Sequence, residues 1–383
     1  MKPSQARITT SHSSSITELR SPWSIRQLTE GDVAGVADLF ERVYPQQRWQ
    51  SREQCETYFR RIFFANPWRH LELPSWIAVE AGGVAGFAGV LPRPMMYGSR
   101  PVSVAVGSQF MVHPERRRTL IALELVKRIL SGPQDLFVTD ASSDEAKSAW
   151  LGVGGVVPIL QNLHWTRVLR PMRYTIDLLE KNRRLRPLAG AARLPGALVD
   201  SLAARLHPNR FARGDRVTRL EPLDAAGMLD AIPELVESNR ALRAHYDERS
   251  LTWLLEEAAR KSRHGALRAR AVVDTTRLLG WFIYYARAGA INEVLQLTAR
   301  EDSFDVVLRR LLIDAWEQGA TAVRGRVEPR FAPQLSDQHC WFRREGGWTL
   351  VHSRDDELLE SIERGSASIG RLDGQWWLRF HDR

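Results

Sequence analysis

The sequence has 383 residues, of which 44% are hydrophobic, and this length suits two or three globular domains with cores of their own. The formal net charge is +9, so an anionic partner, cofactor or substrate is expected. The arginine excess is spread along the chain without a block of the kind seen in nucleic-acid-binding tails, which argues against a nucleic-acid partner. No apolar run approaches the ~20 residues that cross a bilayer.

The two cysteines, Cys55 and Cys340, lie far apart and lack the paired spacing of zinc ligands. The sequence therefore predicts neither a disulfide framework nor a metal site, and it favours a reducing, cytoplasmic setting. The N-terminal stretch has no apolar core segment, so no secretory signal is expected.

Residues 1–22 are rich in Ser and Thr and poor in apolar residues, which predicts a disordered leader. Periodic apolar residues and helix caps then predict a short strand and two helices. These elements span 24–28, 29–44 with Thr29 as a cap, and 51–64, after which Asn66-Pro67 ends the second helix.

Two strands follow at 76–80 and 84–91, and Gly82-Gly83 between them predicts a tight hairpin. The next strand, 101–112, first alternates apolar residues and is then interrupted by Gly-Ser-Gln. A glycine inside a strand often marks a bulge or a close backbone approach, so an irregularity is expected at that point.

Residues 109–130, QFMVHPERRRTLIALELVKRIL, are the most informative segment for function. An apolar strand ends in Val-His-Pro-Glu and passes through Arg116, Arg117 and Arg118 into an amphipathic helix over 116–130. The first-turn N–H groups of a helix are unpaired, and the helix dipole adds partial positive charge. Together with three guanidinium groups, this arrangement predicts an anion site that suits a diphosphate.

A strand at 136–139, a short helix capped by Ser142 or Ser143, and a strand at 164–170 complete a first unit, predicted as a domain over 23–175. Residues 176–215 are predicted to form a basic linker with a short helix around 197–206. The stretch 181–216 contains nine Lys and Arg residues but only two acidic residues. A solvated connector is the simplest interpretation, and contact with an acidic membrane surface is the alternative.

The same order of elements returns in a second predicted domain over 216–383. Its elements are a strand at 216–220, helices at 224–238 and 249–259, strands at 267–273, 278–286 and 290–298, a helix at 303–318, a strand at 321–326, a short helix near Pro333 and a strand at GGWTLV. Both halves follow β-α-α-β-β-β-α-β-α-β, which indicates duplication of a fold. A helix at 355–364 and a terminal strand at 375–380 are expected to extend the second copy.

Three features of residues 24–170 resemble the GNAT superfamily of acyl-CoA-dependent acyltransferases. The hairpin WIAVEAGGVAGFAGVLPR is similar to the family's second and third strands. The segment FMVHPERRRTLIALEL is similar to its fourth strand and third helix, where the family has Val-x-Pro-Glu and then Arg/Gln-x-x-Gly-x-Gly/Ala. The turn LGVGGVVP is similar to the family's final helix and glycine-containing turn.

Residues 216–352 match the family in element order only, so the whole chain resembles a tandem GNAT protein. The resemblance implies an α/β fold of two GNAT-like domains, each a mostly antiparallel twisted sheet flanked by helices. It also implies an acyl-CoA co-substrate, most simply acetyl-CoA, bound by the first copy.

Carried over position by position, Arg117 takes the family's Arg/Gln position and Ala122 its last small position, whereas Leu120 replaces the usual glycine. That glycine lets backbone N–H groups approach the diphosphate, so a leucine would narrow the site unless the loop has negative φ. By resemblance, the backbone of Phe110, Met111 and Val112 would bind the pantetheine arm, and the diphosphate loop would comprise Arg116, Arg117, Arg118, Thr119, Leu120, Ile121 and Ala122.

The matching stretch of the second copy, LQLTAREDSFDVVLRR, has Glu301, Asp302 and Asp305 at its helix start. Carboxylates there satisfy the helix dipole and would repel a diphosphate. The second copy is therefore expected not to bind acyl-CoA, and instead to shape a substrate cleft or a dimer contact. The oligomeric state is left open.

Transfer of an acyl group to an amine needs a proton acceptor near neutral pH. Asp140, at the end of a strand beside the expected cofactor site, is the candidate general base, and capping of the next helix is its alternative role. His113 and Glu115 flank the loop and are interpreted as structural. Trp150 stands near the place of a tyrosine that often acts as general acid in the family, and it has no comparably labile proton.

The predicted function is transfer of an acyl group from acyl-CoA to an amine or hydroxyl of a small-molecule or saccharide acceptor, without a covalent enzyme intermediate. One alternative is an aminoacyl-tRNA-dependent transferase, which tandem GNAT-like halves with eroded CoA loops also resemble, although no coiled-coil arm is visible. The other alternative is a non-catalytic binding or scaffold protein, which Leu120, Trp150 and the acidic second loop favour.

Overall fold

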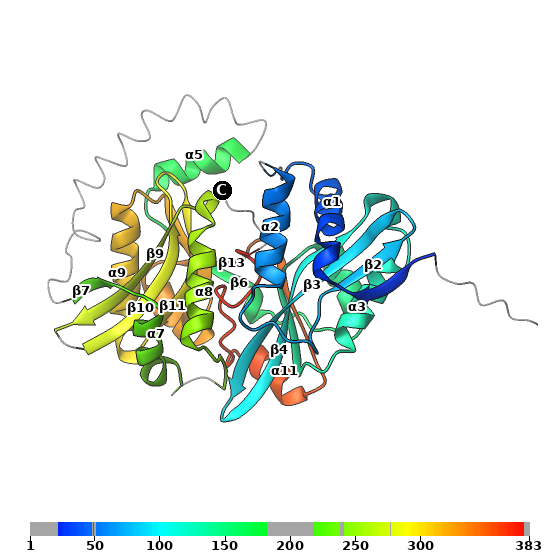
Figure 1. The fold of residues 1–383 in the computed structure, drawn as a ribbon. Coiled ribbons are helices and arrows are strands. Elements are labelled where there is room, and N and C mark those ends of the chain that lie inside the picture. The colour runs from blue at the N-terminus through cyan, green and yellow to red at the C-terminus, as the bar shows by residue number, and fades with distance from the viewer. Residues whose placement is uncertain are drawn as a thin grey trace, which may run out of the picture.

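The computed structural model describes residues 22–47, 49, 51–181, 218–237, 241–275 and 277–378. Two sheets lie side by side, with α2 (Arg52–Phe63) and α8 (Glu248–Ala259) between them (Figure 1). Arg61 of α2 and Glu257 of α8 form an ion pair of 2.5 Å there. The predicted leader, apart from its last residue, lies outside the described residues. So do residues 182–215 of the predicted linker, with its short helix at 197–206, and the first two residues of the predicted strand 216–220.

The first sheet has the strand order β1-β2-β3-β4-β5-β14, and β8 pairs with the end of β3. Neighbouring strands are antiparallel except β4 and β5, which are parallel. The strands are β1 (Ser24–Gln27), β2 (Trp76–Glu80), β3 (Gly83–Tyr97), β4 (Arg100–Val112), β5 (Leu136–Ser142), β8 (Leu242–Ala244) and β14 (Trp348–Ser353).

The second sheet has the order β13-β6-β12-β11-β10-β9-β7, with β11 and β12 as its parallel pair. The strands are β6 (Leu163–Val168), β7 (Thr218–Pro222), β9 (Ala266–Asp274), β10 (Arg277–Ala286), β11 (Ile291–Ala299), β12 (Ala322–Arg326) and β13 (Trp341–Arg344). Each sheet therefore carries one parallel pair in an otherwise antiparallel arrangement, and the predicted fold class, a mixed α/β fold in two tandem units, is confirmed.

The helices begin where the sequence provides caps. Ser51 accepts a hydrogen bond from the Gln54 N–H at 3.2 Å, and Ser143 accepts one from the Ala146 N–H at 3.2 Å. The other α-helices of the described residues are α1 (Val33–Val43), α3 (Ile121–Leu130), α4 (Asp144–Leu151), α5 (Pro171–Lys181), α7 (Ala225–Ile232), α9 (Phe304–Glu317), α10 (Ala332–Asp337) and α11 (Asp356–Glu363). Among the described helices, none is long and apolar enough to cross a membrane.

The two sheets exchange strands. β6, predicted to complete the first unit, instead pairs with β12 and β13 of the second sheet. In return β14, from the second half of the chain, pairs with β5 along 136–142. The predicted domain ranges 23–175 and 216–383 thus do not coincide with the two sheets, because the first sheet takes β8 and β14 from the second half of the sequence and the second sheet takes β6 from the first half.

Apolar residues form three clusters. One lies under α3 and α4 of the first sheet and includes Ile121, Phe137 and Trp150, and another lies under α9 of the second sheet. The third joins both halves, since it contains residues of α1, α2 and β3 together with α8 and β10. The two units are therefore packed on one shared core.

Three local predictions are wrong. The first six residues of the predicted linker, 176–181, belong to α5. The predicted helix 224–238 leaves α-helical geometry at Pro233, whose missing N–H breaks the ladder, and a π-helical turn, η4, spans Pro233–Glu237. The predicted terminal strand is not a strand over 375–378, because the Gln375 N–H binds Asp140 and the Trp377 side chain is buried.

Candidate functional site

β4 and β5 diverge to form a fork. They pair only over Val104–Val106 and Leu136–Val138, although β4 runs on to Val112 and β5 to Ser142. Among the described strands, none pairs with the β5-facing edge of β4 beyond Val106. The backbone of Phe110, Met111 and Val112 therefore lies along a sheet edge that a linear ligand could pair with.

A bulge in β4 accompanies the fork. Phe87 pairs with Met111 and Gly89 with Ser108, so Gln109 and Phe110 both stand opposite a single residue of β3. Gln109 has a φ of +55°, which is rare for a residue with a side chain. A bulge bends its strand and increases the twist, so this irregularity, which the Gly-Ser-Gln interruption predicted, turns β4 away from β5.

Two side chains at the bulge were not assigned from the sequence. Gln109 is buried, and its Nε2 donates to the Tyr58 hydroxyl at 2.5 Å. The Ser108 hydroxyl is also buried, and it has no hydrogen-bond partner among the described residues. The Gly-Ser-Gln interruption in the apolar strand could have drawn attention to Ser108 and Gln109. A sequence pattern does not show, however, which of these two polar side chains is left unpaired.

The basic turn follows β4 directly. Residues 114–116 form the 3₁₀ turn η2 (Pro114–Arg116), and the Nδ1 of His113 accepts from the Glu115 N–H at 3.3 Å, in agreement with the structural interpretation of His113. The Nε of Arg116 binds both carboxylate oxygens of Glu80 on β2, at 2.9 and 3.0 Å. The Arg116 guanidinium is thus held at β2 by this ion pair. Arg117 and Arg118, in contrast, are exposed and have no ion-pair partner among the described residues.

α3 begins at Ile121, five residues later than predicted, because Thr119 closes a turn on Arg116 through both its N–H and its hydroxyl. The Thr119 hydroxyl also accepts from the Ile121 N–H at 3.4 Å, whereas the N–H groups of Ala122 and Leu123 have no partner among the described residues. Leu120 has a φ of −78°, so glycine is not required there, and its side chain is 60% exposed. Ile121 is fully buried and anchors the helix start.

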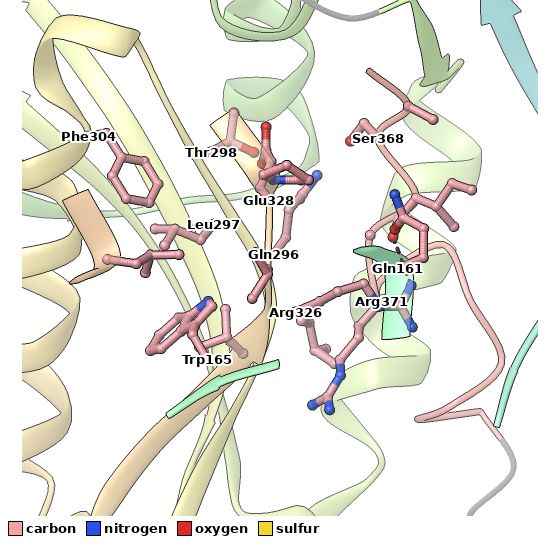
Figure 2. A pocket seen from close by; sticks show the side chains of 18 residues that line it. Gln161, Trp165, Gln296, Leu297, Thr298, Phe304, Arg326, Glu328, Ser368 and Arg371 are labelled. Carbon is pink, nitrogen blue, oxygen red and sulfur yellow. Dashed lines mark hydrogen bonds between the residues drawn. The ribbon is translucent and has the colours of Figure 1, made fainter. Parts of the chain in front are cut away.

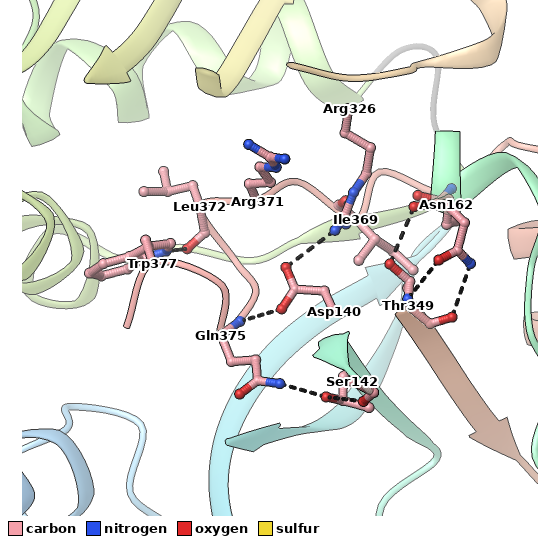
Figure 3. A network of polar contacts seen from close by, with 12 residues as sticks. Asp140, Ser142, Asn162, Arg326, Thr349, Ile369, Arg371, Leu372, Gln375 and Trp377 are labelled. Carbon is pink, nitrogen blue, oxygen red and sulfur yellow. Dashed lines mark hydrogen bonds and ion pairs between the residues drawn. The ribbon is translucent and has the colours of Figure 1, made fainter. Parts of the chain in front are cut away.

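Asp140 lies on β5 at the fork and joins the two sheets. Its Oδ2 accepts from Arg326 of β12 at 3.2 Å, and its Oδ1 accepts from the Gln375 N–H at 2.9 Å (Figure 3). The helix-cap alternative is wrong, because Ser143 caps α4. The sequence could not show that the candidate base is buried against an arginine 186 residues away.

Trp150 belongs to the core. It is 6% exposed, its Nε1 donates to the Val351 carbonyl at 3.0 Å, and its ring lies 5.2 Å from that of Phe137. Trp150, which stands near the place of the family's proton-donating tyrosine, therefore supports the contact between α4 and β14.

The second sheet has a matching fork. β11 and β12 pair only over Ile291–Glu293 and Ala322–Arg324, and a cavity beyond them is lined by Trp165, Thr298 and Phe304, among others (Figure 2). The C-terminal segment enters this fork, where the Leu372 N–H donates to the Leu295 carbonyl at 3.2 Å and Arg326 donates to the Ile369 carbonyl at 2.9 Å.

Two of the acidic residues at the start of α9 have basic partners. Glu301 lies 3.7 Å from Arg330, and Asp302 lies 3.4 Å from Arg277. The hydrogen bond from Ser303 and the nearby Arg277 hold the pKa of Asp302 below its usual range, so a negative charge stays at this helix start. Asp305 is exposed in the first turn of α9.

Comparison with known proteins identifies structures of the same fold. No protein-family model and no curated protein matches the sequence. Three solved structures match 87–90% of this chain and 73% of their own. A GCN5-related N-acetyltransferase from Anabaena variabilis is 11% identical with a TM-score of 0.56, and one from Kribbella flavida is 13% identical with a TM-score of 0.53. A protein from Enterococcus faecalis described as a probable N-acyltransferase is 10% identical with a TM-score of 0.55.

Each of these matches spans both sheets, because it covers nearly nine tenths of the chain. The forked strands, the bulged β4 and the uncapped helix after the basic turn lie within the first of the two units. The chain therefore has the fold of the GCN5-related N-acetyltransferases, present as a tandem pair.

Proposed function

We propose that the first unit binds an acyl-CoA, most simply acetyl-CoA, and transfers the acyl group to an amine or hydroxyl acceptor. The observation that carries the proposal is the set of unpaired donors at the start of α3. Arg117 and Arg118 have no partner among the described residues, and the N–H groups of Ala122 and Leu123 are equally unpaired. A diphosphate at this helix N-terminus would satisfy all of them.

The fork supplies the second part of the site. The open edge of β4 at Phe110, Met111 and Val112 begins one turn before the arginines, so a pantetheine arm could lie along it with its diphosphate at α3. Acyl-CoA brings a thioester whose carbonyl carbon accepts the nucleophile. The chain would contribute by holding and orienting the two reactants and by polarising that carbonyl through backbone N–H groups. Asp140 stays the predicted proton acceptor on the other side of the fork.

Titration calorimetry with acetyl-CoA tests the proposal on the full chain. Arg117→Ala removes a charge-assisted hydrogen bond of about 1.5–3 kcal/mol, so the dissociation constant should rise about tenfold or more. Arg309→Ala is the matched control, because Arg309 is also an exposed arginine but lies on α9 of the second unit. Unchanged affinity in Arg117→Ala, or equal loss in both variants, would remove the assignment.

A second candidate is a protein that binds acyl-CoA without transferring the acyl group. Trp150 in the core and the two hydrogen bonds that hold Asp140 favour it, since neither residue is free to move a proton in this arrangement. Release of free CoA thiol from acetyl-CoA in the presence of amines separates the candidates, because a binding protein gives none above the uncatalysed rate.

A further inference from the structure

Residues 374–378 of the C-terminal segment, here called the strap, bind one strand of the first fork. The Gln375 N–H donates to Oδ1 of Asp140 at 2.9 Å, and the Gln375 side chain donates to the Thr139 hydroxyl at 2.7 Å (Figure 3). Both acceptors lie on β5 beyond its last pair with β4. A Cβ at Gly374 would stand 2.2 Å from Oδ2 of Asp140, so the glycine lets the strap backbone lie directly against this carboxylate.

The strap also reaches the other strand of the fork. The Leu378 carbonyl accepts a hydrogen bond from the Tyr58 hydroxyl of α2. The same hydroxyl accepts from Nε2 of Gln109, at the bulge of β4, at 2.5 Å. The strap therefore spans the opening between the two strands, with hydrogen bonds to β5 at one end and a link through Tyr58 to β4 at the other.

The strap lies on the face of the first sheet opposite α3. Val106 of β4 belongs to the apolar cluster that contains Trp377, whereas the preceding residue, Ala105, belongs to the cluster under α3. Successive side chains of a strand point to opposite faces, so the two clusters cover the two faces of the sheet. A pantetheine arm that starts at α3 and passes through the fork would present its thioester to the strap.

Little room remains between the strap and the fork. The cavity there has a volume of about 20 Å³ and is lined by Val106, Val138, Asp373 and Gly374, among others. A water molecule needs roughly 10–15 Å³ of such volume, so the cavity holds about one water. Trp377 and Leu378 are fully buried, and Gln375 is 7% exposed. An acceptor therefore has no room at the fork on this face while the strap is in place.

The chain before the strap is anchored separately. Arg371 forms an ion pair of 2.5 Å with Glu293, and the Leu372 N–H donates to the Leu295 carbonyl at 3.2 Å. Neither contact involves a residue of the strap, so both can persist when the strap detaches. Within the strap, the Trp377 ring is the largest buried group, and its Nε1 donates to the Leu372 carbonyl at 3.0 Å. Burial of this ring is the main contribution that holds the strap in place.

We propose that the strap is an autoinhibitory element that closes the acceptor side of the first fork, and that it leaves this position before an acceptor is acylated. Its departure would open the fork opposite α3. It would also release Oδ1 of Asp140, the predicted proton acceptor, while Arg326 keeps Oδ2. This inference rests on the proposed acyl transfer, because it concerns the regulation of the same site.

Hydrogen exchange of the full chain, followed by mass spectrometry at increasing urea, tests the opening without a measurement of activity. Amides of the strap should exchange through a local opening, at a rate that is nearly independent of urea at low concentration. Amides within β5 should exchange only through global unfolding, at a rate that rises steeply with urea. A strap that exchanges only together with β5 would overturn the inference.

Trp377→Ala removes the ring that anchors the strap. Exchange in the strap should become about a hundredfold or more faster, and release of CoA thiol from acetyl-CoA with amines should rise about tenfold or more. Gln375→Ala keeps the ring and removes only the bond to Thr139, so it should change both rates about fivefold. Phe331→Ala is the matched control, because Phe331 is an equally buried ring under α9 of the second sheet. It should lose stability without faster thiol release.

Thiol release that falls in a folded Trp377→Ala, or that rises equally in Phe331→Ala, would contradict the autoinhibitory role. Gln375→Ala gives the same decision if Trp377→Ala does not fold. Acetyl-CoA titrations of the same samples keep the two proposals apart. A chain that binds acetyl-CoA but whose strap exchanges only with β5 contradicts only this inference, and one whose strap opens locally without binding acetyl-CoA contradicts the proposed function.

Discussion

Arg326 and Asp140 form an ion pair between the two sheets, with side chains that are 8% and 0% exposed. Arg371 and Arg324 lie in the same region and share Glu293, at 2.5 and 3.5 Å. Each of these arginines is held in an ion pair. The sequence presented all of them as scattered basic residues, and only the tertiary structure shows which carboxylate each of them pairs with.

His164 of β6, beside these arginines, makes the stability of the folded protein depend on pH. Burial, with the charges of Arg371, Arg326 and Arg324, lowers the pKa of His164 to about 2, so the folded protein holds a neutral ring. The unfolded chain takes up a proton below about pH 6.5, where the folded chain does not. The free energy of unfolding should therefore fall as the pH drops from 6.5 to 5, by about 1.4 kcal/mol per pH unit from this residue.

Urea unfolding between pH 7.5 and 5 checks this expectation. His164→Gln should reduce the pH dependence, whereas His70→Gln, at an exposed loop position, should leave it unchanged. Burial also lowers the pKa of His352, so some dependence should persist in His164→Gln. An identical slope in His164→Gln and the wild type would contradict the assignment.

The contact between α3 and β3 sets where the basic turn lies. Gly86 of β3 lets the helix approach, since a Cβ there would stand 2.8 Å from the Cγ2 of Ile121 and 2.9 Å from the Cδ1 of Leu125. The sequence predicted both the hairpin and the amphipathic helix. The predicted start of the helix was too early, because apolar periodicity alone does not reveal the turn that Thr119 closes on Arg116.

Gly86→Val should therefore push α3 from the sheet and lower the free energy of unfolding by about 1–3 kcal/mol, as over-packing of a core does. Because Ile121 begins α3, acetyl-CoA should also bind more weakly. Gly82→Ala is the control, since a Cβ at Gly82 meets nothing within 4 Å. Urea unfolding and calorimetry give the two values, and a Gly86→Val protein as stable as Gly82→Ala would show that the contact does not position the helix.

On the scale of the whole molecule, the exchange of β6 and β14 and the shared core tie the two units together. If the chain is divided between the predicted domains, the first sheet lacks β8 and β14 and the second sheet lacks β6. The predicted duplication is present in the order of the elements, yet the two copies are not separate bodies. The C-terminal segment also links the two sheets, since Gln375 binds Asp140 in the first sheet and Leu372 binds Leu295 in the second.

The whole chain should consequently unfold in a single calorimetric transition. A fragment of residues 1–181, which keeps the basic turn and the fork but lacks β14, should not fold, because β5 and Trp150 lose their partners on that strand. Calorimetry of the full chain and circular dichroism of the fragment measure these outcomes. Two resolved transitions, or a fragment with a cooperative melt, would mean that the first unit is independent.

The sequence alone determined most of the helices and strands, their repeated order and the basic turn that leads into α3. These features depend on apolar periodicity, caps and turn residues, whose effects act within a few positions of the chain. Only the tertiary structure decided which sheet receives β6 and β14, and which arginine pairs with Asp140. Those outcomes depend on contacts between residues far apart in sequence, as for Asp140 and Arg326, and no local pattern encodes them.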